Sequence, residues 1–235
     1  MKILAIIPAR SGSKGIQLKN IKKLVKIPLI EYTLNSAKKS NKINKILVST
    51  DDKQIIKICN KLSIEAPFIR PKTLARDDTS ITEVIHHSLQ YLQDVENYVP
   101  DIIILLQPTS PLRTHHDIDK GIQLLLKSNA TSVISVSTLK KHPYISFWKK
   151  VNYLKPFQKN FLKYNGRQKL PTLFYPNGTI YVFWYNTWIK YGTIYGPRIK
   201  PMIMLPEKSI DIDDPLDFFF CEMIMKNWKS FKKRF

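Results

Sequence analysis

Near its start the chain carries a short apolar run that leads into a loop of glycine and basic residues: Ile3-Leu4-Ala5-Ile6-Ile7-Pro8, then Ala9-Arg10-Ser11-Gly12-Ser13-Lys14-Gly15. The apolar run is typical of a buried β-strand, and a segment of helical periodicity around residues 29–37 follows the loop. A second apolar run, residues 46–50, comes next. Strands and helices that alternate in this way predict parallel strands joined by crossover helices.

The same alternation continues along most of the chain. Further strands are expected at residues 67–69, 101–106, 131–136 and 179–184, and further helices at residues 55–62, 80–92, 118–126 and from Pro215 onward. Residues 101–106 form the most continuously apolar run, which indicates a central strand covered on both faces. The pairs Ser80 with Glu83 and Thr114 with Asp117 have the spacing of a capping box at a helix start.

Residues 139–174 break this pattern, because aromatic, lysine and proline residues mix there without clear periodicity. We expect this segment to be an inserted arm and not part of the sheet. We find neither an internal repeat nor a low-complexity linker. The sequence therefore predicts one α/β domain over residues 1–235, with residues 139–174 as its arm.

Composition excludes several classes of protein. The 43% apolar content of the 235 residues is too high for a disordered chain, and no apolar run approaches the roughly 20 residues of a membrane span. The apolar run at residues 3–7 is too short for a signal peptide. Two cysteines, Cys59 and Cys221, provide neither a disulfide framework nor a metal-binding spacing. We expect a cytoplasmic protein with no membrane partner.

The formal charge is +20, but only seven of the 38 basic residues are arginine and most of the excess is dispersed lysine. No nucleic-acid-binding motif accompanies the basic segment 226–234, so we expect no nucleic-acid partner. A basic nucleic-acid-binding protein is the alternative from a different class.

The loop after the first strand is a candidate phosphate site. Arg10, Lys14 and Lys19 stand close to Gly12 and Gly15, at the carboxyl end of a strand, where open α/β sheets bind ligands. Glycines let backbone amides approach phosphate oxygens, and the cations neutralise their charge. Neither a Walker A spacing nor a dinucleotide fingerprint is present.

A candidate metal site lies in Ile210-Asp211-Ile212-Asp213. We expect a strand here, in which both carboxylates share one face. Two carboxylates on one face suit Mg²⁺, which takes its other ligands from phosphate and water. Together with the phosphate loop, the pair predicts metal-assisted chemistry on a nucleoside triphosphate.

Three further segments are polar at positions where a site could form. They are residues 107–113, which end in Arg113, residues 70–80, which contain Arg70 and Arg76, and residues 167–181, which run from Arg167 to Tyr181. Helix capping explains the hydroxyl group of Ser80 equally well.

Taken together, these motifs resemble the acylneuraminate cytidylyltransferase family, also called CMP-sialic acid synthetases. The matching segments follow the family's order through nearly the whole chain: residues 7–15, 19–20, 49–52, 70–71, 74–75, 106–114, 167–168, 170–171, 177–178, 180–181 and 209–213. The resemblance implies a Rossmann-like nucleotidyltransferase sheet, mostly parallel, with an arm used in dimerisation. It also implies a homodimer that transfers CMP from CTP to the anomeric C2 hydroxyl of a nonulosonic acid and releases pyrophosphate.

The resemblance also implies a role for individual residues. Arg10, Lys19 and Asp211 would be catalytic. The nucleotide would be bound by Arg10, Ser13, Lys14, Lys19, Asn20, Arg70, Ala75 and Ser80. The acidic nine-carbon sugar would be bound by Gln107, Thr109, Ser110, Arg167 and Tyr181. Asp211 and Asp213 would hold Mg²⁺ (or Mn²⁺).

The sequence leaves the sugar open. Lys169 stands where the family commonly has an acidic or apolar residue, close to the segment that would face the sugar. The main expectation is N-acylneuraminate or a relative such as legionaminate, and the alternatives are pseudaminate or an eight-carbon ulosonate. Whether Arg167 serves its own site or that of a partner subunit is also open.

Overall fold

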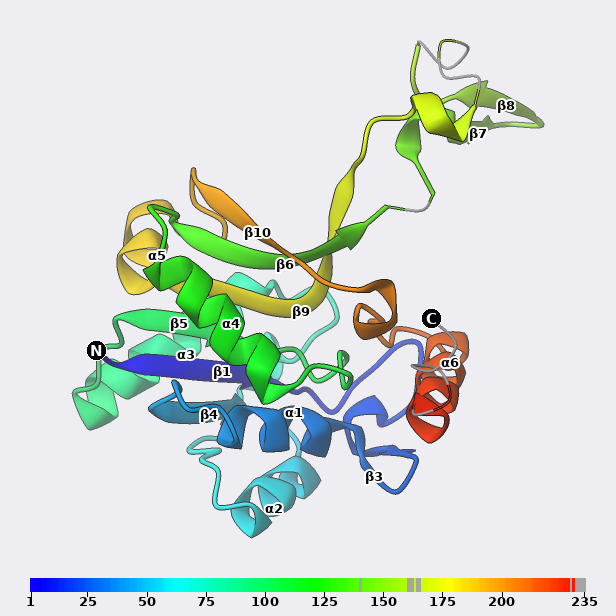
Figure 1. Cartoon of the computed structure of the whole chain (residues 1–235). Helices are drawn as coiled ribbons and strands as arrows, with labels where there is room; N and C mark the ends of the chain where they lie inside the picture. The colour runs from blue at the N-terminus through cyan, green and yellow to red at the C-terminus, as the bar shows by residue number, and fades with distance from the viewer. Residues whose placement is uncertain (140, 160–162, 164–165, 229, 231–235) are drawn as a thin grey trace.

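The computed structural model has a six-stranded sheet at its centre, with helices on both faces (Figure 1). It describes residues 1–139, 141–159, 163, 166–228 and 230. The strands lie in the order β10 (Ile199–Ile203), β6 (Ser132–Thr138), β9 (Phe174–Trp184), β5 (Ile102–Leu105), β1 (Ile3–Pro8) and β4 (Lys45–Ser49). Only β9 runs antiparallel to its neighbours. The expected α/β fold with a mostly parallel sheet is confirmed.

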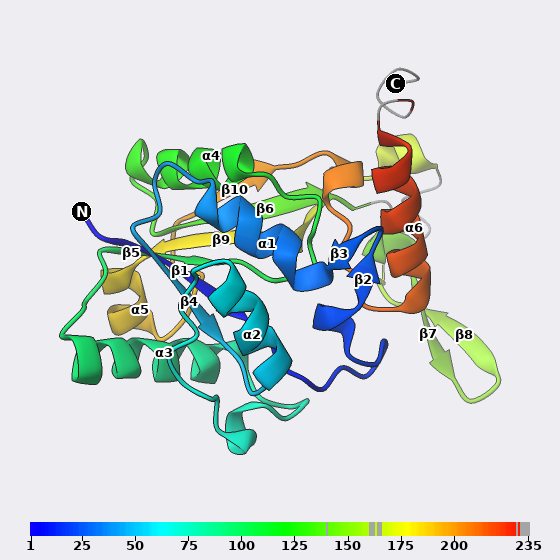
Figure 2. The same cartoon turned by 90° about the horizontal axis from the view of Figure 1, so that it is seen from below.

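Alternate residues of each strand face opposite helical layers, as the two-residue period of a strand requires. Ile3 and Ile7 of β1 pack with one layer, and Leu4 packs with the other. The first layer consists of α1 (Leu29–Lys38), α2 (Lys53–Lys61) and α4 (His115–Leu126), and the second of α3 (Ile81–Glu96) and α5 (Tyr185–Tyr191). Figure 2 shows α1 and α4 on one side of the sheet and α3 and α5 on the other.

Local signals fix the start of three helices. The Oγ of Ser80 accepts the N–H of Glu83 at the start of α3, and Thr114 and Asp117 form the same capping box at the start of α4. Both boxes are confirmed. Asp214 caps α6 (Pro215–Lys226), whose first residue is the expected proline.

Two expected strands are absent from the described structure. Residues 67–69 form no strand. In this region only two isolated parallel bridges, Glu65 with Leu47 and Ile69 with Thr50, join the described chain to β4 and the residue after it. Residues 210–213 are extended but lie outside any strand, and the N–H of Ile212 donates to the Thr109 carbonyl over 2.9 Å. The expectation of a strand carrying Asp211 and Asp213 is therefore wrong.

Several elements have no counterpart in the sequence-based expectation. Helix α5, the edge strand β10 and a small hairpin of β2 (Lys23–Leu24) and β3 (Ile27–Pro28) are among them. The hairpin and α6 enclose a separate apolar cluster that contains Leu24, Ile212 and Cys221. This cluster holds residues 210–213 against the end of the sheet.

Residues 139–174 leave the body between β6 and β9. They carry a hairpin of β7 (Phe147–Lys150) and β8 (Tyr153–Pro156), which projects away from the sheet (Figure 1). Nothing in the irregular sequence pattern of this segment indicated the hairpin. Its use in dimerisation stays a prediction.

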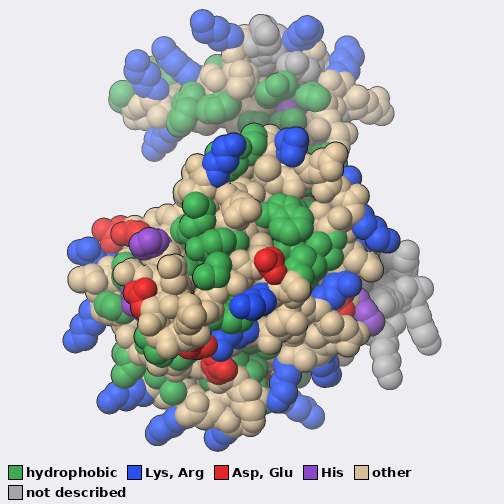
Figure 3. Space-filling model, turned by 90° about the vertical axis from the view of Figure 1, so that its left-hand side faces the viewer, with side chains coloured by type: hydrophobic (Ala, Val, Ile, Leu, Met, Phe, Trp, Pro, Cys, Tyr) green, Lys and Arg blue, Asp and Glu red, His purple; other side chains and the backbone are tan. Residues whose placement is uncertain are grey.

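On the face that Figure 3 shows, the described basic residues do not gather into one patch. Figure 3 shows lysine and arginine side chains scattered over the face at the left of Figure 1 and around the arm. Residues 229 and 231–234 of the basic segment 226–234 lie outside the described part of the chain. Among the described residues, no helix is both long and apolar enough to cross a bilayer. Cys59 and Cys221 are buried free thiols.

Candidate active site

A cleft of about 580 Å³ opens at the carboxyl ends of β1 and β5. The chain leaves β1 toward β4 and leaves β5 toward β6, on opposite sides of this strand pair, so the cleft lies at a topological switch point of the sheet. The predicted site residues that line it are Arg10, Ser13, Lys14, Lys19, Asn20, Arg70, Gln107, Thr109, Asp211 and Asp213.

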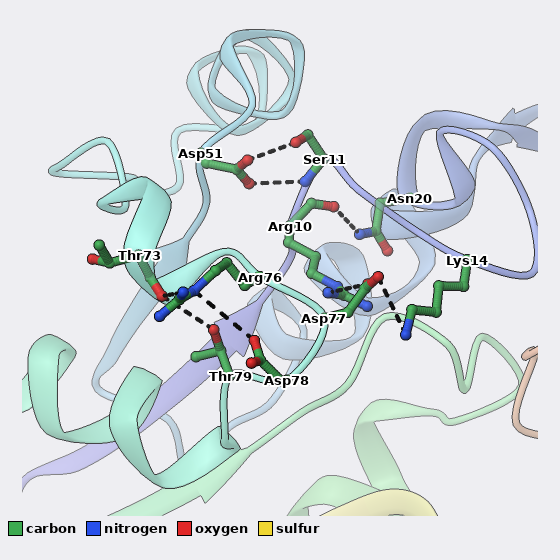
Figure 4. Close-up of polar contacts among 10 residues, drawn as sticks. All are labelled: Arg10, Ser11, Lys14, Asn20, Asp51, Thr73, Arg76, Asp77, Asp78 and Thr79. Atoms are coloured by element: carbon green, nitrogen blue, oxygen red, sulfur yellow. Dashed lines mark hydrogen bonds and ion pairs between the residues drawn. The ribbon is translucent and has the colours of Figure 1, made fainter.

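The loop after β1, residues 10–20, is anchored at both ends. The backbone N–H and the hydroxyl of Ser11 donate to the two carboxylate oxygens of Asp51, over 2.8 and 2.5 Å. The buried amide of Asn20 donates to the carbonyl of Arg10 over 2.9 Å. The loop is thereby held in place before any ligand binds, and Figure 4 shows both contacts.

Gly15 brings this loop against the acidic segment, residues 209–213. A Cβ atom built on Gly15 would lie 2.0 Å from the carbonyl oxygen of Asp213, a separation that no side chain tolerates. At Gly12 a Cβ would meet nothing within 4 Å. Gly15 is therefore required by the close approach of two backbones, whereas Gly12 has free space around it.

Lys19 joins the same two segments electrostatically. Its Nζ donates to the Ile212 carbonyl over 2.6 Å and lies 3.3 Å from Asp213 Oδ1. The lysine side chain is nearly buried, and the Asp213 carboxylate is 77% exposed. A positive charge is thereby fixed beside the two carboxylates that face the cleft.

Asp211 is the buried member of this carboxylate pair. Its Oδ1 has no hydrogen-bond partner within the described residues. Burial raises the pKa of Asp211, as do the charges of Asp213 and Asp217, while a hydrogen bond from Thr109 and the charge of Lys19 lower it. A buried carboxylate oxygen without a partner is suited to bind a cation.

The buried Oδ1 of Asp211, which lacks a partner among the described residues, also makes this pair of carboxylates suitable for Mg²⁺. No cluster of three or more His, Cys, Asp or Glu side chains that could hold a metal occurs in the part of the chain that the structure describes. Mg²⁺ needs no such cluster, because it commonly keeps several waters and binds one or two carboxylates plus substrate phosphates. Asp211 and Asp213 meet that requirement.

Two buried arginines direct their hydrogen bonds to groups of the protein itself. Arg70 donates from Nε to the Oγ of Ser49 over 3.0 Å and from Nη2 to the Ser49 carbonyl, and burial lowers its pKa to about 10. Arg113 donates to the Thr179 carbonyl and the Thr33 hydroxyl, and burial lowers its pKa to about 9. Arg70 still lines the cleft, but Arg113 does not. Arg113 therefore stabilises the protein next to the cleft, where it also donates to the carbonyl of the lining residue Gln107.

Other predicted site residues do not line the cleft in the described structure. Ala75 and Ser80 flank lining residues, and Ser80 is engaged as the cap of α3. Ser110 is buried, and its Oγ lacks a partner among the described residues. Tyr181 packs on the α3 side of the sheet, and burial raises its pKa to about 12. Arg167 begins a short 3-10 helix in the arm, and its side chain lies outside the described part of the structure.

Sequence reasoning missed the role of one cleft residue. Asp77 lies between Arg10 and Lys14, with 2.6 Å from Oδ1 to Nη1 of the arginine and 3.4 Å from Oδ2 to Nζ of the lysine (Figure 4). The sequence places Asp77 between Arg76 and Asp78 in an irregular segment, with no periodicity that shows which of these side chains turns inward. The contact spans more than 60 positions and has no local signal.

Comparison with known proteins identifies the family. A family model described as cytidylyltransferase matches residues 4–192. The N-acylneuraminate cytidylyltransferase of Escherichia coli O18:K1:H7 is 34% identical over 92% of this chain, which spans half the length of that relative. The CMP-N,N'-diacetyllegionaminic acid synthase of Legionella pneumophila is 33% identical over 96% of this chain and 97% of its own length.

A solved structure shares the fold. CMP:2-keto-3-deoxy-manno-octonic acid synthetase, in complex with CTP, superposes with a TM-score of 0.70 over 97% of this chain and 99% of that chain, at 15% sequence identity. At that identity the likeness concerns the fold alone.

Proposed function

Since the chain belongs to the cytidylyltransferase family and is thereby a nucleotidyltransferase, we propose that it transfers CMP from CTP to the anomeric C2 hydroxyl of a nonulosonic acid. Pyrophosphate is the second product. The proposed acceptor is N-acylneuraminate or a relative such as legionaminate, the sugars named in the two relatives. The observation that carries this proposal is the cleft itself, which joins a cationic glycine loop to the carboxylates of Asp211 and Asp213.

In the proposed reaction the cationic loop binds the triphosphate. Arg10, Lys14 and Lys19 reach the cleft from one anchored loop, and their charges offset the negative charge that develops on the phosphate oxygens. The C2 hydroxyl of the sugar gives up its proton to water as its oxygen attacks the α-phosphorus. The bond from that phosphorus to the β-phosphate oxygen breaks, and pyrophosphate leaves with the bonding electron pair. Positioning and electrostatics supply the catalysis, so no nucleophilic side chain is required.

Asp211 and Asp213 are proposed to hold Mg²⁺ or Mn²⁺. When bound, the ion neutralises charge on the reacting phosphate oxygens. The Oδ1 of Asp211, which has no hydrogen-bond partner among the described residues, would be available to the ion. Thr109 holds the same carboxylate by a hydrogen bond. Gly178, with φ of 73°, packs against Asp211 and Gln107, which fixes the floor of the cleft beside the carboxylate.

The residues proposed to contact the cytidine and those proposed to contact the sugar are assigned to different ends of the cleft. We assign the cytidine to the side of Arg70, with Ala75 and Ser80 near the rim. We assign the sugar to the side of Gln107 and Thr109, with Ser110 and Tyr181 behind them and Arg167 supplied from an arm. The support is the position of Gln107 and Thr109, which follow β5 and line the cleft together with Asp211.

The chain is proposed to act as a homodimer through residues 139–174. The hairpin of the arm exposes large apolar side chains, with Trp148 at 59%, Tyr153 at 77% and Leu154 at 65%. Clustered exposed apolar side chains are typical of a protein interface. Light scattering of the wild type should give the mass of two chains, and Trp148→Glu should shift it toward one. A wild-type mass of one chain at micromolar concentration would exclude the dimer.

A pyrophosphate-release assay tests the proposed reaction. CTP and Mg²⁺ are supplied with N-acetylneuraminate, legionaminate, pseudaminate or an eight-carbon ulosonate, and ATP replaces CTP as the nucleotide control. We expect turnover with CTP and at least one nine-carbon acid, and a large loss in Arg10→Gln. Turnover with the eight-carbon acid alone would transfer the proposal to that substrate. Salt-dependent binding of DNA without any CTP turnover would contradict it.

The proposed location is the cytoplasm. The two free thiols, Cys59 and Cys221, agree with a reducing compartment.

A further inference from the structure

One carboxylate occupies the part of the cleft where phosphate oxygens are expected. The two oxygens of Asp77 face two different cations of the loop, Arg10 and Lys14, over 2.6 and 3.4 Å. Figure 4 shows the carboxyl group between these side chains. A single anion thus already bridges the cations that are proposed to bind the triphosphate.

A polyphosphate and this carboxylate compete for the same donors. An oxygen that reaches both Arg10 and Lys14 must lie next to Asp77, and like charges in contact repel strongly where water is partly excluded. Binding of a polyphosphate to both cations therefore requires the carboxylate to withdraw.

Asp77 is the partner that can move. The loop of Arg10 is fixed by short hydrogen bonds from Ser11 to Asp51, of 2.8 and 2.5 Å. The turn that carries Asp77 is held by longer ones, 3.3 Å from Thr79 N–H to the Arg76 carbonyl and 3.4 Å from Arg76 Nε to the Thr73 carbonyl. The Asp77 side chain is also 40% exposed, so it can swing toward solvent.

We infer that Asp77 is an internal counter-ion, displaced by the triphosphate of CTP and restored to Arg10 and Lys14 as pyrophosphate leaves. This inference rests on the proposed function, because it takes the cleft to be the triphosphate site. Asp77 weakens the binding of every polyphosphate to the cleft, and it thereby limits inhibition by the pyrophosphate product. It is a positioning residue that acts through the loop cations.

Calorimetric titration with inorganic tripolyphosphate, in the presence of Mg²⁺, tests the inference apart from cytidylyl transfer. Asp77→Asn should bind tripolyphosphate about three- to tenfold more tightly than wild type, the range expected when one or two partly exposed ion pairs no longer compete. Asp78→Asn is the matched control, because Asp78 is 83% exposed and contacts only Arg76, at 3.9 Å, among the described ion pairs. It should change the dissociation constant less than twofold.

Two further measurements separate competition from a structural effect. In an Arg10→Gln background the gain from Asp77→Asn should shrink below twofold, because the nearer of the two contested cations is gone and Lys14 lies 3.4 Å from the carboxylate with a largely exposed side chain. In the transfer assay, Asp77→Asn should lower both the KM for CTP and the inhibition constant of pyrophosphate without raising kcat. Asp77→Ser, which also removes the charge, serves as a second variant, and thermal unfolding of each variant shows that it is folded.

The outcomes distinguish this inference from the proposed function. Normal CTP turnover together with unchanged or weaker tripolyphosphate binding in Asp77→Asn would overturn the counter-ion role alone. Failure of the wild type to bind either CTP or tripolyphosphate would overturn both.

Discussion

The two walls of the cleft are built differently. One wall consists of the loop at residues 10–20 and the acidic segment at residues 209–213, which interlock through Gly15 and Lys19 with contacts of backbone on backbone and a 2.6 Å hydrogen bond. The opposite wall, residues 71–80, contains no buried residue. Backbone hydrogen bonds of 2.9 and 3.1 Å close its first turn at Leu74 and Ala75, but the turn that carries Asp77 is held only by bonds of 3.3 to 3.4 Å among the described residues. Both walls carry charge, but only the first is fixed by burial.

This difference assigns separate tasks to the walls. Groups that stabilise a transition state need fixed positions, because reorganisation during the reaction diminishes their effect. Groups that admit and release a substrate need to move. Substitutions at the contact residues of the interlocked wall should therefore reduce turnover or stability strongly, and substitutions in the opposite wall should have smaller effects on turnover.

The largest effect is expected for Asp211→Asn. Loss of the buried carboxylate removes the group proposed to hold the metal ion, so kcat should fall by about 10³-fold or more. The fold should survive, because the amide is isosteric and no hydrogen-bond partner of Oδ1 within the described residues is lost. Steady-state kinetics and far-ultraviolet circular dichroism measure both effects. Near-normal activity would show that this wall does not hold the metal.

Gly15→Ala should break the interlock directly. The added Cβ would meet the Asp213 carbonyl at 2.0 Å, so the two segments must separate, with a loss of about 1 to 3 kcal/mol in the free energy of unfolding. Turnover should fall as well, since the loop cations shift away from the carboxylates. Gly12→Ala in the same loop is the matched control and should leave stability and turnover close to wild type. Equal behaviour of the two variants would refute the contact.

The free energy of unfolding should depend on pH through Asp211, the buried carboxylate of the interlocked wall. The folded-state pKa of Asp211 is raised, so its favourable contribution to stability is fully present below the unfolded pKa and is lost as pH rises through the folded one. As pH rises above about 4, the ordinary pKa of an aspartate, the wild type should therefore lose stability relative to Asp211→Asn. Urea unfolding without added metal measures the difference. Parallel pH profiles for the two proteins would contradict the raised pKa.

The smallest effect on activity is expected for Ser80→Ala in the opposite wall. The hydroxyl caps α3 by accepting the N–H of Glu83, so its loss should lower the free energy of unfolding by about 1 kcal/mol. The KM for CTP should change less than about threefold, which is under 1 kcal/mol of binding free energy. A tenfold rise in KM with unchanged stability would instead place Ser80 on the cytidine and make this wall part of the fixed site.

Much of the fold could be predicted because its signals are local. The helix starts at Ser80 and Thr114 depend on residues three positions apart, and the central strand at residues 102–105 depends on an unbroken apolar run. The edge strand β10 has no such signal, since Lys200 and Pro201 interrupt its apolar residues. Residues 210–213 alternate like a strand, yet Ile212 pairs with a loop carbonyl outside the sheet.

The site could be predicted only in part for a related reason. The motifs place Arg10 just after β1 and Gln107 just after β5, and the topology of a parallel sheet brings these two strand ends together. The pairing of Asp77 with Arg10 depends on how an irregular turn is oriented, which no periodicity encodes. Arg113 shows the converse case. It stands in a site-like motif, but burial directs it to Thr179 and Thr33 behind the cleft.

The central claim is that the C2 hydroxyl of a nine-carbon sugar acid attacks the α-phosphorus of CTP in this cleft. The most direct test is a reaction with sugar labelled with oxygen-18 at the C2 hydroxyl, followed by phosphorus NMR of both products. We expect the label to be retained in the bridge between sugar and CMP and to be absent from pyrophosphate. Label lost to water, or recovered in pyrophosphate, would contradict it.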